Sequence, residues 1–187
     1  MKIAIVGGIG SGKSEVLKSL KDMGVATLDA DAINAELLAM PEYVARIEKL
    51  FPSVVEKGQV NRKKLSRIVF NDSLARARLN AVAHPLVLQR IKRDERNPLV
   101  VEIPLLFESG AASLFDAIVF VLAPLEKRIE RLTKSRNMSI EDALSRINSQ
   151  VDEEEYARVA TKVIVNDSSL EQLKHKTEEV FSELLQK

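Results

Sequence analysis

Short apolar runs alternate with longer amphipathic stretches along the chain. Five runs rich in valine and isoleucine show little polar alternation: Lys2–Val6, Val25–Asp29, Leu99–Ile103, Ala117–Leu122 and Val163–Asn166. Such runs are typical of strands that are covered on both faces. Helical patterns lie between them, among them Lys13–Met23, Leu125–Ser135 and Ser169–Leu185. The alternation predicts an α/β fold with a mostly parallel sheet flanked by helices.

Residues 32–92 interrupt the alternation with an almost entirely helical pattern. This stretch of about sixty residues exceeds what a simple crossover between two strands needs. Asn61 is a candidate N-cap for one helix. Asn71 or Asp72 is a candidate N-cap for the next, which we expect to end near His84-Pro85 because proline disrupts helix interiors. The segment is therefore predicted to be a helical insertion.

Residues 136–158 form a second interruption with short, charged helical patterns. Ser139 is a candidate N-cap, and Glu141 and Asp142 would follow in the first turn, where acidic side chains are favoured. Open α/β sheets bind their ligands at the carboxyl edge of the strands. We expect both interruptions to emerge beside that edge.

Composition narrows the class of protein. The 187 residues suffice for one domain with small insertions, and a net charge of +1 gives no global field for binding nucleic acid or a membrane. The absence of cysteine excludes disulfides and thiol catalysis, and with two histidines it makes a structural zinc site unfavourable. We expect a cytoplasmic protein without a membrane span, and nothing in the sequence indicates an obligate protein partner.

A glycine-rich stretch follows the first predicted strand. The sequence GGIGSGKS, residues 7–14, satisfies G-x-x-x-x-G-K-[ST] between a strand and a helix, whereas the dinucleotide-binding fingerprint fails because Lys13 stands where its third glycine belongs. Glycines let backbone amides curl around a phosphate, Lys13 can reach the terminal phosphates, and the Ser14 hydroxyl can bind Mg²⁺. The predicted nucleotide-binding residues are Gly8, Ile9, Gly10, Ser11, Gly12, Lys13, Ser14 and Glu15. The loop predicts a nucleoside triphosphate site.

The chain has no Asn-Lys-x-Asp guanine-reading motif, which favours ATP, and it is short for a motor or a ring ATPase. A small-molecule kinase also needs a group that takes the proton of the acceptor hydroxyl. Asp29 and Asp31 follow the second predicted strand. A carboxylate there can accept a proton or hold Mg²⁺, or it can simply cap the next helix, and the residues alone leave these roles open.

The order of six motifs resembles that of dephospho-CoA kinases over nearly the whole chain: GGIGSGKS, LDADAI, VNRKKLSRIVF, HPLV, EIPLLFESG and RINSQ. The resemblance implies a P-loop NTPase core, a helical CoA-binding insertion and a small lid. It implies that ATP phosphorylates the ribose 3′-hydroxyl of dephospho-CoA, the last step of coenzyme A synthesis, and it places the family's catalytic aspartate at Asp31. The corresponding boundaries are 1–31, 93–135 and 159–187 for the core, 32–92 for the insertion and 136–158 for the lid.

The sequence departs from the family pattern at Glu15 and at Thr161-Lys162, which replaces a common Ala-Asp just before the last predicted strand. Glu15 occupies the place where the family usually has threonine, one position past the magnesium-binding hydroxyl. Asn166 retains the usual asparagine, whose loop can lie near the adenine.

Further polar residues are candidates with a structural alternative. His84 and Arg62 could contact the substrate, although a histidine ending a helix is commonly structural. Glu102, at a strand end, could act near magnesium, and Glu108 could instead order its loop. No pattern in the sequence decides between these roles.

A basic run lies in the helical pattern after the fourth predicted strand: Lys127, Arg128, Arg131, Lys134 and Arg136. Its spacing with Glu126 and Glu130 is typical of a solvated helix face. Arg136, where the lid begins, and Arg146, in RINSQ, are the better candidates for contacting the transferring phosphate.

Two other functions remain as alternatives at this point. One is a different small-molecule P-loop kinase, of the shikimate or nucleoside-monophosphate kind, against which the helical insertion with HPLV and PLLFE argues. The other is a nucleotide-dependent binding or regulatory module with little turnover.

Overall fold

The computed structural model describes residues 1–103, 106–107, 109–150 and 153–186. The chain forms two compact units. The first comprises Met1–Leu28 and Arg96–Lys187, and the second comprises Asp29–Glu95. Residues 32–92, predicted to form an insertion, lie within the second unit.

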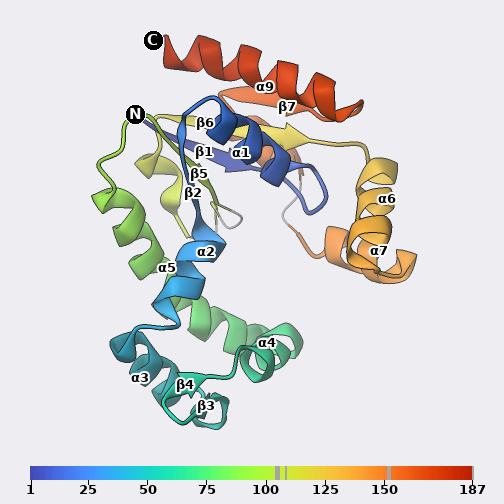
Figure 1. Ribbon diagram of the computed structural model, residues 1–187. Helices are drawn as coiled ribbons and strands as arrows, with labels where there is room; N and C mark the ends of the chain where they lie inside the picture. The colour runs from blue at the N-terminus through green and yellow to red at the C-terminus, as the bar shows by residue number, and fades with distance from the viewer. Residues whose placement is uncertain (104–105, 108, 151–152, 187) are drawn as a thin grey trace. The chain divides into compact units, whose positions relative to one another are not determined.

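A five-stranded sheet forms the centre of the first unit (Figure 1). Its strands are β1 (Lys2–Val6), β2 (Ala26–Asp29), β5 (Leu99–Glu102), β6 (Ala117–Leu122) and β7 (Lys162–Val165). They are ordered β2-β5-β1-β6-β7. The β1–β5, β1–β6 and β6–β7 pairs are parallel. The predicted mostly parallel sheet is confirmed, and each strand begins and ends within about one residue of its predicted bounds.

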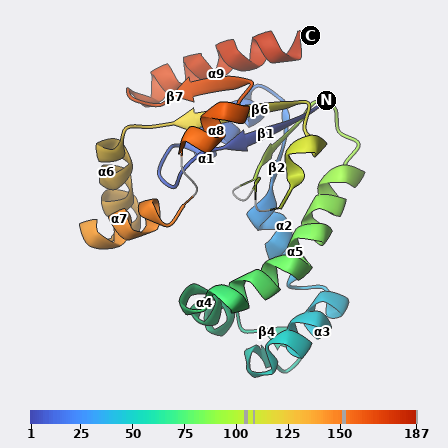
Figure 2. The same ribbon diagram turned by 180° about the vertical axis from the view of Figure 1, so that it is seen from behind.

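Helices α1 (Lys13–Asp22), α8 (Glu153–Val159) and α9 (Leu170–Leu185) pack against the faces of this sheet. Helices α6 (Leu125–Arg136) and α7 (Ile140–Asn148) lie beyond the ends of its strands (Figure 1). Helices α1 and α9 pack together on one face, where Ile3 and Ile5 of β1 meet Phe181 of α9 in a fully buried cluster. On the other face, where Figure 2 shows α8, Tyr156 of α8 stacks on Phe120 of β6. Their ring centroids lie 5.6 Å apart.

Two helices in this unit begin at a serine cap, and the cap predicted at Ser139 is confirmed. Ser139 accepts a hydrogen bond from the amide of Asp142 at 3.0 Å and begins α7. Ser169 caps α9 in the same way. Local sequence signals therefore set where these helices begin.

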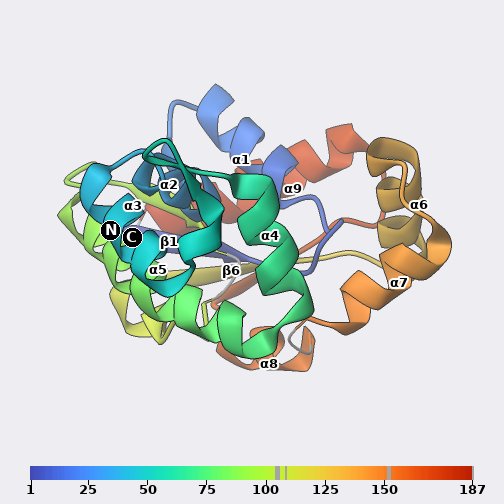
Figure 3. The same ribbon diagram turned by 90° about the horizontal axis from the view of Figure 1, so that it is seen from below.

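The second unit is mostly helical and contains α2 (Ala30–Leu37), α3 (Pro41–Leu50), α4 (Arg62–Asn71) and α5 (Ser73–Arg93). The long helix α5 contacts the other three (Figure 3). Asn61 caps α4 as predicted, and Asp72, one of the two candidates, caps α5 through the amides of Leu74 and Ala75.

Two predictions for this unit are wrong. A short hairpin of β3 (Val55–Glu56) and β4 (Gln59–Val60) interrupts the helices. It turns at Lys57 and Gly58, whose φ angles of 51° and 76° suit a tight two-residue hairpin turn. Gly58 was the local signal for this turn.

Helix α5 also continues through Pro85 to Arg93 instead of ending near His84-Pro85. Its buried residues Ala83, Val87 and Ile91 recur every four positions. One apolar face thus runs past the proline, and its packing outweighs the loss of one backbone hydrogen bond.

No helix in the described parts of the chain combines the length and the apolar character that crossing a bilayer requires.

Phe181→Ala should lower the free energy of unfolding by roughly 3–5 kcal/mol, because it removes a fully buried ring and leaves a cavity. Leu170→Ala on the same helix is the matched control, since that side chain is 58% exposed and should matter by less than about 0.5 kcal/mol. Urea unfolding followed by circular dichroism measures both. Equal effects of the two substitutions would contradict the packing of α9 on the sheet.

Candidate active site

The phosphate loop, residues 7–12, connects β1 to α1. Gly7, Gly10 and Gly12 have φ angles of 148°, 78° and 102°. Gly12 is left-handed and stands at the N-cap of α1. Residues with a Cβ adopt such angles only with strain, so the loop depends on glycine at these positions. Ser14 and Glu15 follow in the first turn of α1, and the Glu15 amide donates to the Gly12 oxygen at 3.0 Å.

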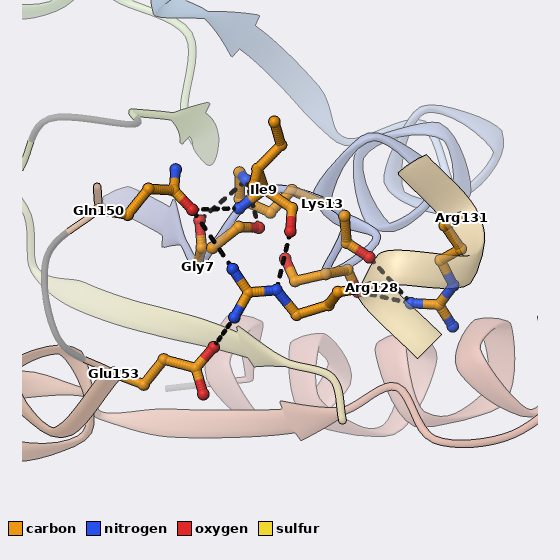
Figure 4. A network of polar contacts seen from close by, with 10 residues as sticks. Gly7, Ile9, Lys13, Arg128, Arg131, Gln150 and Glu153 are labelled. Atoms are coloured by element: carbon orange, nitrogen blue, oxygen red, sulfur yellow. Dashed lines mark hydrogen bonds and ion pairs between the residues drawn. The ribbon is translucent and has the colours of Figure 1, made fainter. Parts of the chain in front are cut away.

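The first carbonyl oxygens of the loop are bound by cationic side chains. Lys13 Nζ donates to the oxygens of Gly7 and Gly8 at 2.9 and 3.3 Å. Arg128 Nε donates to the oxygen of Ile9 at 2.8 Å (Figure 4). Lys13 Nζ also lies 3.7 Å from Glu102 Oε1, at the end of β5, and both side chains are largely buried.

The next two carbonyls are bound from α6 and from the residue after β7. Arg131 Nη1 donates to the oxygen of Gly10 at 3.1 Å, and Asn166 Nδ2 donates to the oxygen of Ser11 at 2.7 Å. Asn166 Oδ1 in turn accepts from Arg131 Nη2 at 3.0 Å. Five consecutive carbonyls, from Gly7 to Ser11, therefore each accept a hydrogen bond from a side chain.

This arrangement directs the amides of the loop. In a planar trans peptide the N–H points away from the C=O, so holding the oxygens of Ile9 and Ser11 sets the amides of Gly10 and Gly12. Neither amide donates to an acceptor within the described residues. In that part of the chain the buried hydroxyl of Ser11 also has no hydrogen-bond partner. Unsatisfied donors in a glycine-lined loop fit an anion with several oxygens, as a polyphosphate has.

The basic run on α6 is not the solvated face that its spacing predicts. Arg128 is 4% exposed and Arg131 is half-buried, and both face the phosphate loop. Burial lowers the pKa of the Arg128 guanidinium, while the negative charge of Glu153 opposes this shift. Lys127 and Lys134 do follow the prediction, since both pair with Glu130 on the exposed side.

Sequence reasoning therefore missed two residues that hold the loop. Arg128 and Arg131 lie three positions apart, one helical turn, and Arg128 lies four before the buried Leu132. That spacing places an arginine on the inward face of α6, and it was the available signal.

Asp29 and Asp31 have distinct positions. Asp29 is the N-cap of α2, and its Oδ1 accepts from the amides of Asp31 and Ala32 at 2.8 and 3.4 Å. The capping role considered for either residue belongs to Asp29, and Asp31 lies in the first turn with an exposed side chain. The structure thereby removes the cap as an explanation for Asp31.

The other substrate candidates also lie in the second unit. His84 is half-buried within α5 rather than at its end. Arg62 begins α4, and its Nη2 donates to the carbonyl oxygen of Ala35 at 2.8 Å, which ties α4 to α2. Substrate contacts of either residue stay predictions.

The lid candidates lie in the first unit. Arg136 is the last residue of α6, and Arg146 lies in the last turn of α7; both are exposed. Helices α6 and α7 contact one another (Figure 3). Glu108 lies outside the described residues.

Gly12→Ala should distort the loop, because a Cβ there would lie 2.2 Å from Asn166 Nδ2 and its φ of 102° is strained for alanine. We expect the increase in melting temperature caused by Mg-ATP to be lost. Gly24→Ala is the matched control: its φ is 79°, but no atom lies within 4 Å of the added carbon. That variant should lose about 1–2 kcal/mol of stability and keep its response to Mg-ATP. The same Mg-ATP response in both variants would contradict the loop assignment.

Comparisons with known proteins agree on one family. A family model described as dephospho-CoA kinase matches residues 1–172. The dephospho-CoA kinase of Thermus thermophilus is 38% identical over 186 residues, which cover 97% of this chain and 91% of the relative. The solved dephospho-CoA kinase from Campylobacter jejuni aligns with a TM-score of 0.72 and 28% identity, covering 100% of this chain and 98% of that one.

A shikimate kinase from Acinetobacter baumannii has a similar fold, with a TM-score of 0.61 over 99% of this chain and 93% of that one. At 15% identity this likeness concerns the fold alone. The P-loop kinase fold is thus shared with enzymes of other substrates, whereas the family match spans most of the sequence. The chain belongs to the dephospho-CoA kinase family.

Proposed function

We propose that the chain transfers the terminal phosphoryl group of ATP to the ribose 3′-hydroxyl of dephospho-CoA, giving coenzyme A and ADP. This is the last step of coenzyme A biosynthesis. The observation that carries the proposal is the phosphate loop, whose carbonyls from Gly7 to Ser11 are all bound by side chains while amides and the Ser11 hydroxyl are left for a ligand. Family membership supplies the acceptor.

The loop and the start of α1 provide the residues that would hold ATP and magnesium. Residues 8–15 would surround the phosphates, and the Ser14 hydroxyl, in the first turn of α1, would bind Mg²⁺. When bound, the ion neutralises charge on the phosphates. Among the described residues no three His, Cys, Asp or Glu side chains gather into a metal site. Magnesium in such enzymes commonly takes few protein ligands and relies on substrate phosphates.

Positive charge would stabilise the transferring phosphoryl group. Lys13 rests on two loop carbonyls and Glu102, and phosphate oxygens offer it stronger acceptors. Arg136 and Arg146 would add charge when residues 136–158 close as a lid, which excludes water from the reaction. Their exposed positions in the first unit are compatible with such a movement.

The acceptor would be handled by the second unit. The Asp31 carboxylate would take the proton of the ribose hydroxyl as its oxygen attacks phosphorus, which makes it the general base. His84 and Arg62 are proposed to contact dephospho-CoA. We also propose that the protein acts in the cytoplasm without nucleic acid, a membrane or an obligate protein partner, which its net charge of +1 supports.

A coupled ADP-release assay with dephospho-CoA, shikimate, nucleoside monophosphates or no acceptor tests the function. We expect only dephospho-CoA to stimulate turnover. Stimulation by another acceptor would indicate a different small-molecule kinase. An increase in melting temperature with Mg-ATP but no turnover with any acceptor would indicate a binding module.

Lys13→Ala serves as the inactive variant in this assay. It should nearly abolish turnover, because it removes the cation from the phosphate site. Its melting temperature without nucleotide should stay within a few degrees of the parent, and the parent alone should be markedly stabilised by Mg-ATP. Equal stabilisation of both proteins would count against the phosphate role of Lys13.

Asp31→Asn should lower kcat by about 10²- to 10⁴-fold, since asparagine keeps the shape but takes up no proton. Asp29→Asn is the matched control, because asparagine caps α2 nearly as well and should leave kcat close to that of the parent. Steady-state kinetics with dephospho-CoA measures both. A parent-like Asp31→Asn enzyme beside an inactive Asp29→Asn enzyme would exchange the two roles, and partial recovery in excess magnesium would make Asp31 a metal ligand instead.

A further inference from the structure

We infer that Arg128 is a positioning residue that fixes the shape of the phosphate loop and joins the loop to the chain at Gln150 and Glu153. Where its test measures turnover, this inference rests on the proposed function. Where the test measures nucleotide binding, it rests on the loop alone.

The guanidinium of Arg128 connects three separate segments of the first unit (Figure 4). Its Nε donates to the oxygen of Ile9 at 2.8 Å, its Nη2 donates to Gln150 Oε1 at 3.3 Å, and its Nη1 forms an ion pair with Glu153 at the start of α8. A buried charge is costly unless it is paired and hydrogen-bonded. Each nitrogen of this side chain therefore has a partner, one in the phosphate loop and two in the stretch that leads into α8.

Ile9 is held at both of its backbone polar groups. Its oxygen accepts from Arg128, and its amide donates to Gln150 Oε1 at 2.7 Å. The same side-chain oxygen of Gln150 thus serves Ile9 and Arg128 together. Because the peptide is planar, fixing the Ile9 oxygen also fixes the direction of the Gly10 amide. The contact determines which loop amides face a phosphate.

A side chain at Gly8 would collide with the guanidinium of Arg128 in its present position. A Cβ at Gly8 would lie 2.3 Å from Arg128 Nη2, and Gly8 has no positive φ that would demand glycine. The guanidinium occupies the volume that a side chain would need. The same helix crowds Gly10, where a Cβ would lie 3.1 Å from the Arg128 oxygen. Part of the glycine pattern therefore reflects the packing of α6 on the loop.

This network also borders the end of α7. Gly8, Arg128, Gln150 and Glu153 line a cavity of about 450 Å³ together with Ile147 and Asn148, which lie in the last turn of α7. The amide of Gln150 donates to the oxygen of Ile147 at 3.2 Å, so the residue that holds Ile9 is tied to that helix. A displacement of α7 would move the Gln150 oxygen and with it the Ile9 peptide. The position of α7 and the shape of the loop are thus linked through Gln150, which Arg128 contacts as well.

Gln150→Ala tests the link with little risk to folding, because this side chain is exposed. Arg128→Lys keeps the charge but loses the three-way geometry of the guanidinium. Lys127→Ala is the matched control, since Lys127 neighbours Arg128 on α6 and pairs with Glu130 at the surface. Mg-ADP affinity by calorimetry, melting temperature without nucleotide, and the KM values for ATP and dephospho-CoA are measured for each.

We expect Gln150→Ala and Arg128→Lys to weaken Mg-ADP binding and to raise KM for ATP by roughly 10- to 100-fold, the scale of a misplaced binding group. The KM for dephospho-CoA should change by less than about twofold, whereas a general loosening of the protein would alter both KM values and the melting temperature. The variant that combines Gln150→Ala with Arg128→Lys should bind Mg-ADP no more weakly than the more impaired of the two single variants, because both substitutions act through Ile9. Lys127→Ala should match the parent.

Parent-like Mg-ADP affinity in Gln150→Ala would overturn the inference. A double variant whose loss of Mg-ADP affinity equals the product of the two single losses would overturn it as well. If Arg128→Lys does not fold, Gln150→Ala alone decides. A parent that binds Mg-ADP but does not phosphorylate dephospho-CoA would contradict the proposed function, and the binding measurements would still decide the role of Arg128.

Discussion

The nucleotide site depends on the hydrogen bonds that side chains donate to the carbonyl oxygens of the phosphate loop. A loop that wraps an anion with its amides must direct its carbonyl oxygens elsewhere, and buried carbonyls need donors. Here the donors come from Lys13 within the loop motif, from Arg128 and Arg131 on α6, and from Asn166 after β7. The motif thus supplies the amides, and three residues distant in sequence hold them in the geometry that a phosphate requires.

The charges of these donors serve the site in a second way. Two guanidinium groups sit on the carbonyl side of the loop, where they offset the negative ends of the peptide dipoles. Arg128 is almost fully buried, and such a group is tolerated because the carboxylate of Glu153 pairs with it. Removing one partner of such a pair leaves the other charge buried and unpaired, which is why these residues act as a set.

The sheet and several helix starts could be predicted from the sequence, because local patterns determine them. Valine-rich runs marked the strands, and Asn61, Ser139 and Ser169 marked helix starts. Where an apolar face continues past a local breaker, as in α5 at Pro85, propensity alone gave the wrong boundary. The β3–β4 hairpin was missed because its strands are two residues long.

The candidate site was predictable only where one motif contains both the residue and its role. Residues 7–14 could be predicted to bind phosphate, since glycines, lysine and serine follow a strand in one short motif. Arg128 and Arg131 were not predicted to hold the loop, because their loop partners are more than a hundred positions away. Their spacing on α6 signals an inward face but not this contact. The catalytic role predicted for Asp31 came from the family resemblance. The structure added that Asp29 is the cap of α2.

Asn166 also has a consequence for the order in which the protein is made. Its side chain holds the Ser11 carbonyl across 155 positions of sequence, so the loop leaves the ribosome well before the residue that completes it. Folding during synthesis generally proceeds from the N-terminal end. A nascent chain that stops before β7 therefore carries the whole glycine-rich motif without its finished geometry. The finished nucleotide site then becomes available only after β7 and Asn166 have been made.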